Sequence, residues 1–194
     1  TMPILSNSVV TRVLTPAELA ACKVKNETFM TDTRTLRFYY RFLRGNRLQI
    51  GSRSAITGAH AEDPQHLKLL TDAIARKFPP LAGIAIEHSW WGWVDVSHDM
   101  MPRITRAQDS ANVWYAVGYG GNGVAFSTWA GKRLAERVAG MDLGKEVFDL
   151  PIYSSPLPLP QVQFGATFES RLFAPFRRIG QRALYKWYWL RDEY

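Results

Sequence analysis

The sequence predicts an α+β fold, in which an antiparallel sheet with helical cover is followed by a strand, a glycine turn and a helix. Two observations predict the sheet: the strands are joined by hairpin turns, and one long helix is inserted among them. A third observation separates the later part, because residues 112–139 join an aromatic strand to an amphipathic helix through three glycines. We expect this second part to pack into a different layer.

Strand and cap signals define the first elements. Residues 8–14 are apolar enough for a strand. A short helix then begins after Thr15, because Thr15 can cap it while Glu18 completes a capping box. Residues 28–31 and 34–43 are predicted strands, and side chains in the second alternate between two faces.

A hairpin and a long helix come next. Residues 44–46 form a turn, after which residues 47–51 return antiparallel to the preceding strand. A helix is predicted from residue 63 to about residue 78, where two prolines stop it. Its inward side is predicted to contain Leu67, Leu70, Ile74 and Phe78. We expect a long aromatic strand region over 84–96 and a polar turn over 99–104.

The glycine-rich stretch carries the clearest functional signal. Residues 112–117 alternate as a strand, residues 118–122 form a turn, and a helix begins at Gly123. The glycines remove the Cβ atoms that would keep a ligand from the backbone. One helix face is a stripe of small side chains, made of Gly123, Ser127, Gly131 and Ala135. The helix N-terminus therefore predicts a site for an anion or for the electron-rich edge of a cofactor.

The same turn matches the dinucleotide fingerprint through Gly118, Gly120 and Gly123. That fold also needs a second parallel strand after the helix, ending in an acidic residue that binds a ribose. Here the helix ends near Gly140, and the following segment is rich in proline. The sequence therefore argues against a self-sufficient dinucleotide site.

Composition sets further limits. The 194 residues are 46% hydrophobic, which is enough for a core, and no apolar run is long enough to span a bilayer. No signal peptide opens the chain, and Cys22 is its single cysteine, so we expect a cytoplasmic protein without disulfides or a zinc cluster. The net charge of +7 favours acidic ligands or partners. We expect no nucleic-acid binding, because no recognised motif or dense basic block is present.

Three segments also have a recognisable order and spacing. They are DTR, YYR and GNRL within residues 32–48, WGW and DMMPRI within residues 91–104, and NVWYA with GYGGNGV within residues 112–124. Together they resemble the C-terminal part of the D-amino-acid oxidase/glycine oxidase superfamily of FAD-dependent oxidoreductases, most nearly its gamma-glutamylputrescine oxidoreductase-like branch. The resemblance spans roughly residues 8–137.

The resemblance implies a fold and an activity. In such enzymes an N-terminal segment binds the ADP half of FAD, a middle sheet binds a small amine or amino-acid substrate, and the chain returns through a strand, glycine turn and helix. It implies a substrate-binding domain over 1–105, the returning piece of an incomplete FAD-binding domain over 106–140, and a connector with a basic helix over 141–194. The N-terminal FAD-binding segment would be missing, so this chain alone would bind FAD weakly and be inactive.

The resemblance also implies which residues contact the flavin. These are Pro102, Arg103, Gly118, Tyr119, Gly120, Gly121, Asn122, Gly123 and Val124. The N–H groups of the turn from Gly118 to Val124 would stabilise charge on the reduced ring. Asn122 stands where family members commonly have histidine, which leaves the tuning of the flavin open.

Candidate substrate residues have alternative roles. Arg41 and Tyr39 share a strand face, where Arg41 could bind a carboxylate as a fork or could simply be solvated. Trp91, with its tryptophan neighbours, could wall an amine pocket or belong to the core. Trp129 lies on the polar face of its helix and predicts a covering segment.

The C-terminal residues 168–191 predict a basic amphipathic helix. Its apolar face contains Leu172, Phe176, Ile179, Ala183, Trp187 and Leu190. We expect this face to dock on the protein itself, with a membrane surface as the alternative. For the whole chain the alternative to a flavoenzyme portion is a non-catalytic binding module that kept the scaffold and lost the cofactor.

Overall fold

The computed structural model describes residues 2–24, 27–54, 60–96, 102–106, 110–141 and 168–193. They belong to two compact units. The sheet unit consists of residues 4–93 and 175–194, and the corner unit consists of residues 1–3 and 94–174. Our predicted division into 1–105, 106–140 and 141–194 stays a prediction.

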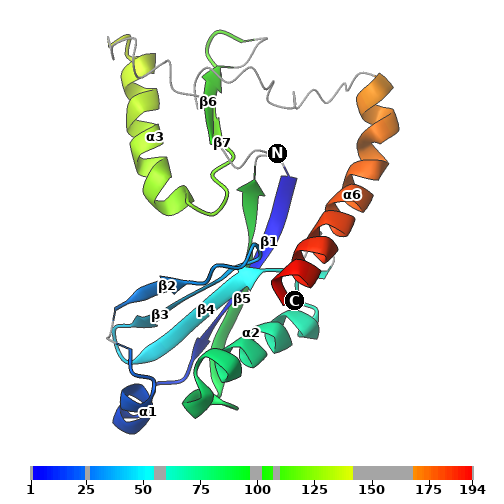
Figure 1. Cartoon of the computed structure of the whole chain (residues 1–194). Helices are drawn as coiled ribbons and strands as arrows, with labels where there is room; N and C mark the ends of the chain where they lie inside the picture. The colour runs from blue at the N-terminus through cyan, green and yellow to red at the C-terminus, as the bar shows by residue number, and fades with distance from the viewer. Residues whose placement is uncertain are drawn as a thin grey trace. The chain divides into compact units, whose positions relative to one another are not determined.

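The sheet unit is built on one five-stranded sheet in the order β2-β3-β4-β1-β5 (Figure 1). Its strands are β1 Met2–Thr11, β2 Phe29–Thr31, β3 Phe38–Leu43, β4 Arg47–Arg53 and β5 Ile86–Val96. Its helices, apart from the C-terminal one, are α1 Pro16–Ala21, α2 Pro64–Lys77 and the 3-10 turn η2 Pro79–Leu81. The pairs β1–β4, β2–β3 and β3–β4 are antiparallel, which confirms the antiparallel sheet with helical cover.

The core lies between α2 and one face of the sheet. Phe38 and Phe42 of β3 point to this face, and the Phe42 ring meets the Phe78 ring at 5.4 Å. Leu70 and Ile74 of α2 are buried in the same cluster. Leu67, which we placed on the inward side, is exposed instead. The side chain of Asp63 caps α2 by accepting a hydrogen bond from the Gln65 N–H at 2.9 Å.

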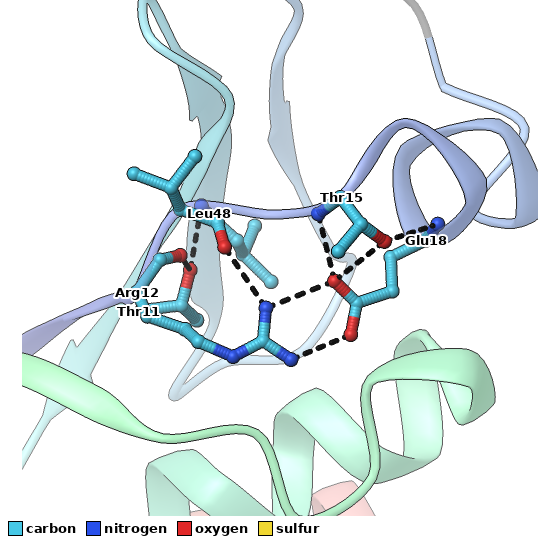
Figure 2. A network of polar contacts seen from close by, with 6 residues as sticks. Thr11, Arg12, Thr15, Glu18 and Leu48 are labelled. Carbon is cyan, nitrogen blue, oxygen red and sulfur yellow. Dashed lines mark hydrogen bonds and ion pairs between the residues drawn. The ribbon is translucent and has the colours of Figure 1, made fainter.

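A polar network connects the end of β1 to α1 (Figure 2). Arg12 donates two hydrogen bonds to the Glu18 carboxylate at 2.9 and 2.6 Å, and the Thr15 N–H donates a third at 2.8 Å. The Glu18 N–H donates back to Thr15 Oγ1 at 3.2 Å, which confirms the capping box. Arg12 first, and then Thr15, lower the pKa of Glu18 to about 2.

The corner unit combines a two-stranded ladder with one helix. β6 Arg103–Arg106 pairs antiparallel with β7 Trp114–Val117, and α3 Gly123–Val138 follows. Arg103 and Ile104 therefore begin a strand, although we predicted a polar turn over 99–104. Ile104 and Ala130 form the centre of a small core. The residues packed against it are Ala116, Tyr119, Phe126, Trp129 and Leu134, so Trp129 is covered by its own unit.

The C-terminal helix α6 Phe168–Glu193 is fixed to the sheet unit near its end. Asp192 accepts hydrogen bonds from the N–H groups of Thr35 and Leu36 at 2.9 and 2.8 Å, and Arg191 donates to Thr35 Oγ1 at 2.6 Å. The helix therefore docks on its own protein as expected. The face that docks differs from the predicted one, because Phe176 and Trp187 are exposed.

Candidate functional site

The glycine turn has a backbone that demands glycine. Gly118, Gly120 and Gly121 have φ angles of 80°, 60° and 100°. Other residues adopt this left-handed region at a cost of about 1–2 kcal/mol each, because Cβ approaches the following carbonyl. We predicted that these glycines leave the backbone open to a ligand. The φ angles add a second role, because the turn itself requires glycine.

An acidic residue that the sequence analysis did not select fixes this turn. A carboxylate oxygen of Asp95, near the end of β5, accepts the Gly118 N–H at 2.8 Å. The main-chain oxygen of Asp95 accepts the Gly120 N–H at 2.9 Å, and Val96 forms a bridge with Tyr119. Two N–H groups of the turn therefore bond to the protein itself. The available signal was an acid flanked by Val94 and Val96, directly after the tryptophans of β5.

We call the turn of residues 118–122 together with the start of α3 the glycine corner. Its open part is the beginning of α3. The first N–H groups of an α-helix have no partner within the helix, and the side chain of Asn122 makes no capping hydrogen bond here. Val124 is 94% exposed, and a Cβ added at Gly121 would meet nothing within 4 Å. Backbone donors, the positive helix end and open space thus coincide at Gly121–Val124. This arrangement suits an electron-rich or anionic group, and it fits the flavin that the resemblance implies.

The other predicted cofactor residues lie at the base of the corner. Arg103 is 6% exposed and donates to the main-chain oxygen of Pro102 at 3.1 Å. The Tyr119 ring packs against Phe126 at 5.7 Å, and burial raises the pKa of the Tyr119 phenol. Arg103 pairs with Val117 in the β6–β7 ladder, one residue before the turn.

The small-residue stripe of α3 points away from the unit's core. Ser127, Gly131 and Ala135 are exposed, and a Cβ added at Gly131 would meet nothing within 4 Å. At the N-terminal end of the stripe, a Cβ added at Gly123 would lie 3.6 Å from the Tyr119 side chain. The core side of the helix is instead formed by Ala130 with the larger residues Phe126, Trp129 and Leu134.

The sheet face opposite α2 contains the predicted substrate residues. The Tyr39 hydroxyl lies 2.8 Å from Ser6 Oγ and 3.0 Å from Ser8 Oγ. Its ring covers Gly51, where an added Cβ would lie 2.4 Å from Tyr39 Cζ. Gly51 therefore lets Tyr39 lie flat across two neighbouring strands, and the tyrosine has a defined position.

Arg41 lies two residues along β3 on the same face. It is exposed, and its Nε donates to Gln49 Oε1 at 3.0 Å. Gln49 is the cross-strand partner of Arg41 in the ladder. This hydrogen bond uses one guanidinium N–H and orients the rest of the fork.

The register of β5 brings Trp91 to this face as well. The Arg12 N–H bonds to the Ala85 oxygen at 2.9 Å, so β1 ends where β5 begins and the two strands run antiparallel. Continued without a bulge, this register places Trp91 opposite Ser6. The Arg47–Glu87 ion pair agrees, since it puts odd-numbered β5 side chains on the face of Arg47. Tyr39, Arg41 and Trp91 therefore share one face.

Within the described ranges, no group of three or more His, Cys, Asp or Glu side chains is arranged to hold a metal ion. No helix in the same part of the chain has the length and apolar character needed to cross a membrane.

Comparison with known proteins gave consistent results. The sequence profile of the family "DAO: FAD dependent oxidoreductase" matches residues 1–137. Gamma-glutamylputrescine oxidoreductase of Escherichia coli is 29% identical over 84% of this chain and 38% of its own length. A probable oxidoreductase OrdL of Haemophilus influenzae is 28% identical over 76% of this chain and 32% of its own length.

Solved structures share the fold. Glycine oxidase from Geobacillus kaustophilus superposes with a TM-score of 0.59 at 20% identity, covering 72% of this chain and 35% of that one. The chain thus spans less than two fifths of the length of the relatives and of this structure.

Proposed function

The chain belongs to the FAD dependent oxidoreductase (DAO) family, and on this premise we propose that it is the C-terminal portion of an enzyme that oxidises an amine or amino acid. The portion supplies a substrate-binding sheet and the glycine corner that meets the flavin. The remaining contacts to FAD come from an N-terminal segment that these 194 residues do not include, so FAD binds weakly to this chain by itself.

The observation that carries the proposal is the construction of the glycine corner. Asp95 holds Gly118 and Gly120, which leaves Gly121 and the first turn of α3 as the donors that face outward. A turn built only for chain reversal would not need an exposed helix N-terminus without a side-chain cap. The corner supports a role in contacting the flavin ring.

FAD, when bound, accepts a hydride from the carbon that bears the substrate's amine. The residues of this chain act around that step. The N-terminal N–H groups of α3 stabilise negative charge close to them, and the open space above Gly121 admits a flat ring. Val124 shields this surface from water when a ring covers it.

The sheet face supplies substrate contacts in the same proposal. Arg41 binds a carboxylate with the guanidinium N–H groups that Gln49 does not use. Tyr39 is held by Ser6 and Ser8 with its ring flat on Gly51, and Trp91 offers a ring face that attracts an ammonium group. A small amino acid matches these three contacts in charge.

The test restores the missing contacts. This chain replaces the matching C-terminal portion of the Escherichia coli gamma-glutamylputrescine oxidoreductase, and the purified chimera is titrated with amines and amino acids under anaerobic conditions. We expect a yellow protein whose flavin absorbance bleaches with at least one substrate. A folded chimera that stays colourless with added FAD would reject the proposal in favour of a binding module without cofactor.

A matched pair of variants separates substrate binding from folding. Arg41→Gln removes the proposed carboxylate contact, whereas Arg44→Gln changes an exposed arginine of the adjacent turn that pairs with Glu27. We expect Arg41→Gln to raise the KM for a carboxylate-bearing substrate by about tenfold or more, since a charge-assisted hydrogen bond contributes ~1.5–3 kcal/mol. Equal KM values in the two variants would remove Arg41 from the site.

A further inference from the structure

The C-terminal helix α6 has two opposite faces with different roles. Its docked face is a polar stripe whose partly buried members are Gln181, Tyr185, Tyr188 and Asp192. These positions recur at intervals of three and four residues, so they form one line along the helix. The helix is therefore held to the sheet unit by a side that we did not predict to dock.

Polar contacts fix this docked face. Burial alone would raise the pKa of Asp192, but the hydrogen bonds from Leu36 and Thr35 outweigh it and lower that pKa. Burial raises the pKa of the Tyr185 phenol, and the nearby Arg53 guanidinium partly offsets the rise. The orientation of α6 on the sheet unit follows from these contacts. The opposite face must then point outward.

The outward face is apolar. Phe176 and Ile179 are each 61% exposed, and Trp187 is 54% exposed. At 100° per residue these positions, with Ala183 and Leu190, centre about 180° away from the docked stripe. No described residue covers this face. Exposed aromatic and aliphatic side chains in a continuous line on one helix indicate a surface that another apolar medium covers.

Basic side chains border the apolar line. Arg182 and Lys186 are exposed, one turn apart, on one flank. Arg191 lies on the other flank, with its guanidinium 5.4 Å from the Trp187 ring centre. An apolar helix face with tryptophan in it and cations beside it is suited to the boundary between acyl chains and anionic headgroups.

We propose that the outward face of α6 binds an anionic membrane surface, with the helix lying in the plane of the interface. The charge of the chain favours an anionic membrane over a second copy of the chain as the partner of this face. The chain carries a net charge of +7, which repels a second copy and is attracted to anionic lipid. The inference goes beyond the proposed function and does not depend on it.

Vesicle co-sedimentation tests the inference with the 194-residue chain. The probes are vesicles of phosphatidylcholine mixed with phosphatidylserine, and vesicles of phosphatidylcholine alone. We expect the chain to sediment with the mixed vesicles, to bind the neutral ones far more weakly, and to be released as salt is raised. No sedimentation with the mixed vesicles would overturn the proposal.

Two variants that lose the same charge localise the binding. Arg182→Gln with Lys186→Gln neutralises the flank of α6, whereas Lys68→Gln with Arg76→Gln neutralises two exposed residues of α2. We expect the first pair to weaken vesicle binding by about thirtyfold and the second by much less, because a basic residue contributes most when it is next to the headgroups. Equal losses would show general electrostatic attraction and overturn the role of α6.

The apolar line is tested by Trp187→Gln with Leu190→Gln, two exposed positions whose replacement leaves the docked stripe intact. We expect vesicle binding to be lost while the circular dichroism spectrum is unchanged. Analytical ultracentrifugation of the wild-type chain supplies the competing outcome. A dimer that these substitutions abolish, without vesicle binding, would assign the face to a second copy and overturn the proposal.

Discussion

The two compact units of the chain differ in how much apolar surface they bury. In the sheet unit α2 covers the core face, and residues from β1, β3, β4 and α2 are buried together. In the corner unit the buried cluster consists of Ile104 and Ala130 with partly buried neighbours, and three members of the small-residue stripe of α3 are exposed, namely Ser127, Gly131 and Ala135. The comparison shows that an amphipathic helix need not bury its small-residue face within its own unit. In α3 that face, on which another surface can pack most closely, is left for a partner outside the unit.

The largest expected effect is a loss of folding stability in the sheet unit. Phe42 is 1% exposed and lies against Phe78, so Phe42→Ala should destabilise the unit by about 3–5 kcal/mol through a cavity. Chemical denaturation followed by circular dichroism measures the change. Phe29→Ala, at an exposed position of β2, is the matched control and should cost far less. Similar losses in both variants would mean that the α2 interface is not the core.

The next effect concerns the corner unit. Asp95→Ala leaves the Gly118 N–H without its acceptor, which should destabilise the turn by about 1–3 kcal/mol. Amide hydrogen exchange is the measurement, with Gly120 as an internal reference because its N–H bonds to the main-chain oxygen of residue 95. Faster exchange at Gly118 than at Gly120 is expected, and Asp95→Asn should restore much of the protection. Unchanged exchange at Gly118 would contradict the proposed tether.

A smaller effect depends on pH and sharpens the account of the sheet unit. The folded-state pKa of Glu18 is about 2, below its unfolded value near 4.5. Its network therefore stabilises the folded state fully above about pH 4.5, and this contribution is lost as pH falls toward 2. Glu18→Gln should flatten that part of the stability profile. An unchanged acid limb in the variant would show that other carboxylates cause the loss.

The smallest effect is expected at an exposed ion pair on α2. Lys68 and Asp72 are one turn apart at 2.7 Å and both are exposed to solvent. Asp72→Asn should change stability by about 0.3–0.5 kcal/mol, and less in high salt. Denaturation at two salt concentrations measures this. A loss above about 1 kcal/mol would mean that the pair is coupled to the core.

Local signals predicted much of the fold. The capping box at Thr15, the hairpin at Asn46 and the Asp63 cap depend on residues close in sequence, and the structure contains all three. Where neighbours in space decide, the sequence was less informative. β3 begins only at Phe38 because Asp32 accepts the Phe38 N–H and holds the preceding segment in a turn.

The candidate site shows the same limit. The glycine turn and the helix start at Gly123 followed from residue type and spacing. The role of Asp95 did not, because it is 23 residues from Gly118 in sequence and an acid in a strand gives no sign of its partner. The docked stripe of α6 was missed for a related reason. Its partners, Thr35 and Leu36, are more than 150 residues away, and their backbone N–H groups have no residue-type signature.

The most direct test of the central claim measures the flavin content of the chimera with and without a charge at the open corner. Val124→Glu adds an acid at an exposed helix N-terminus, which favours the helix but repels an electron-rich ring. Thr128→Glu adds the same charge one turn later as the control. We predict that the wild type and Thr128→Glu retain flavin while Val124→Glu loses most of it. Full flavin content in Val124→Glu would contradict the placement of the ring beside the glycine corner.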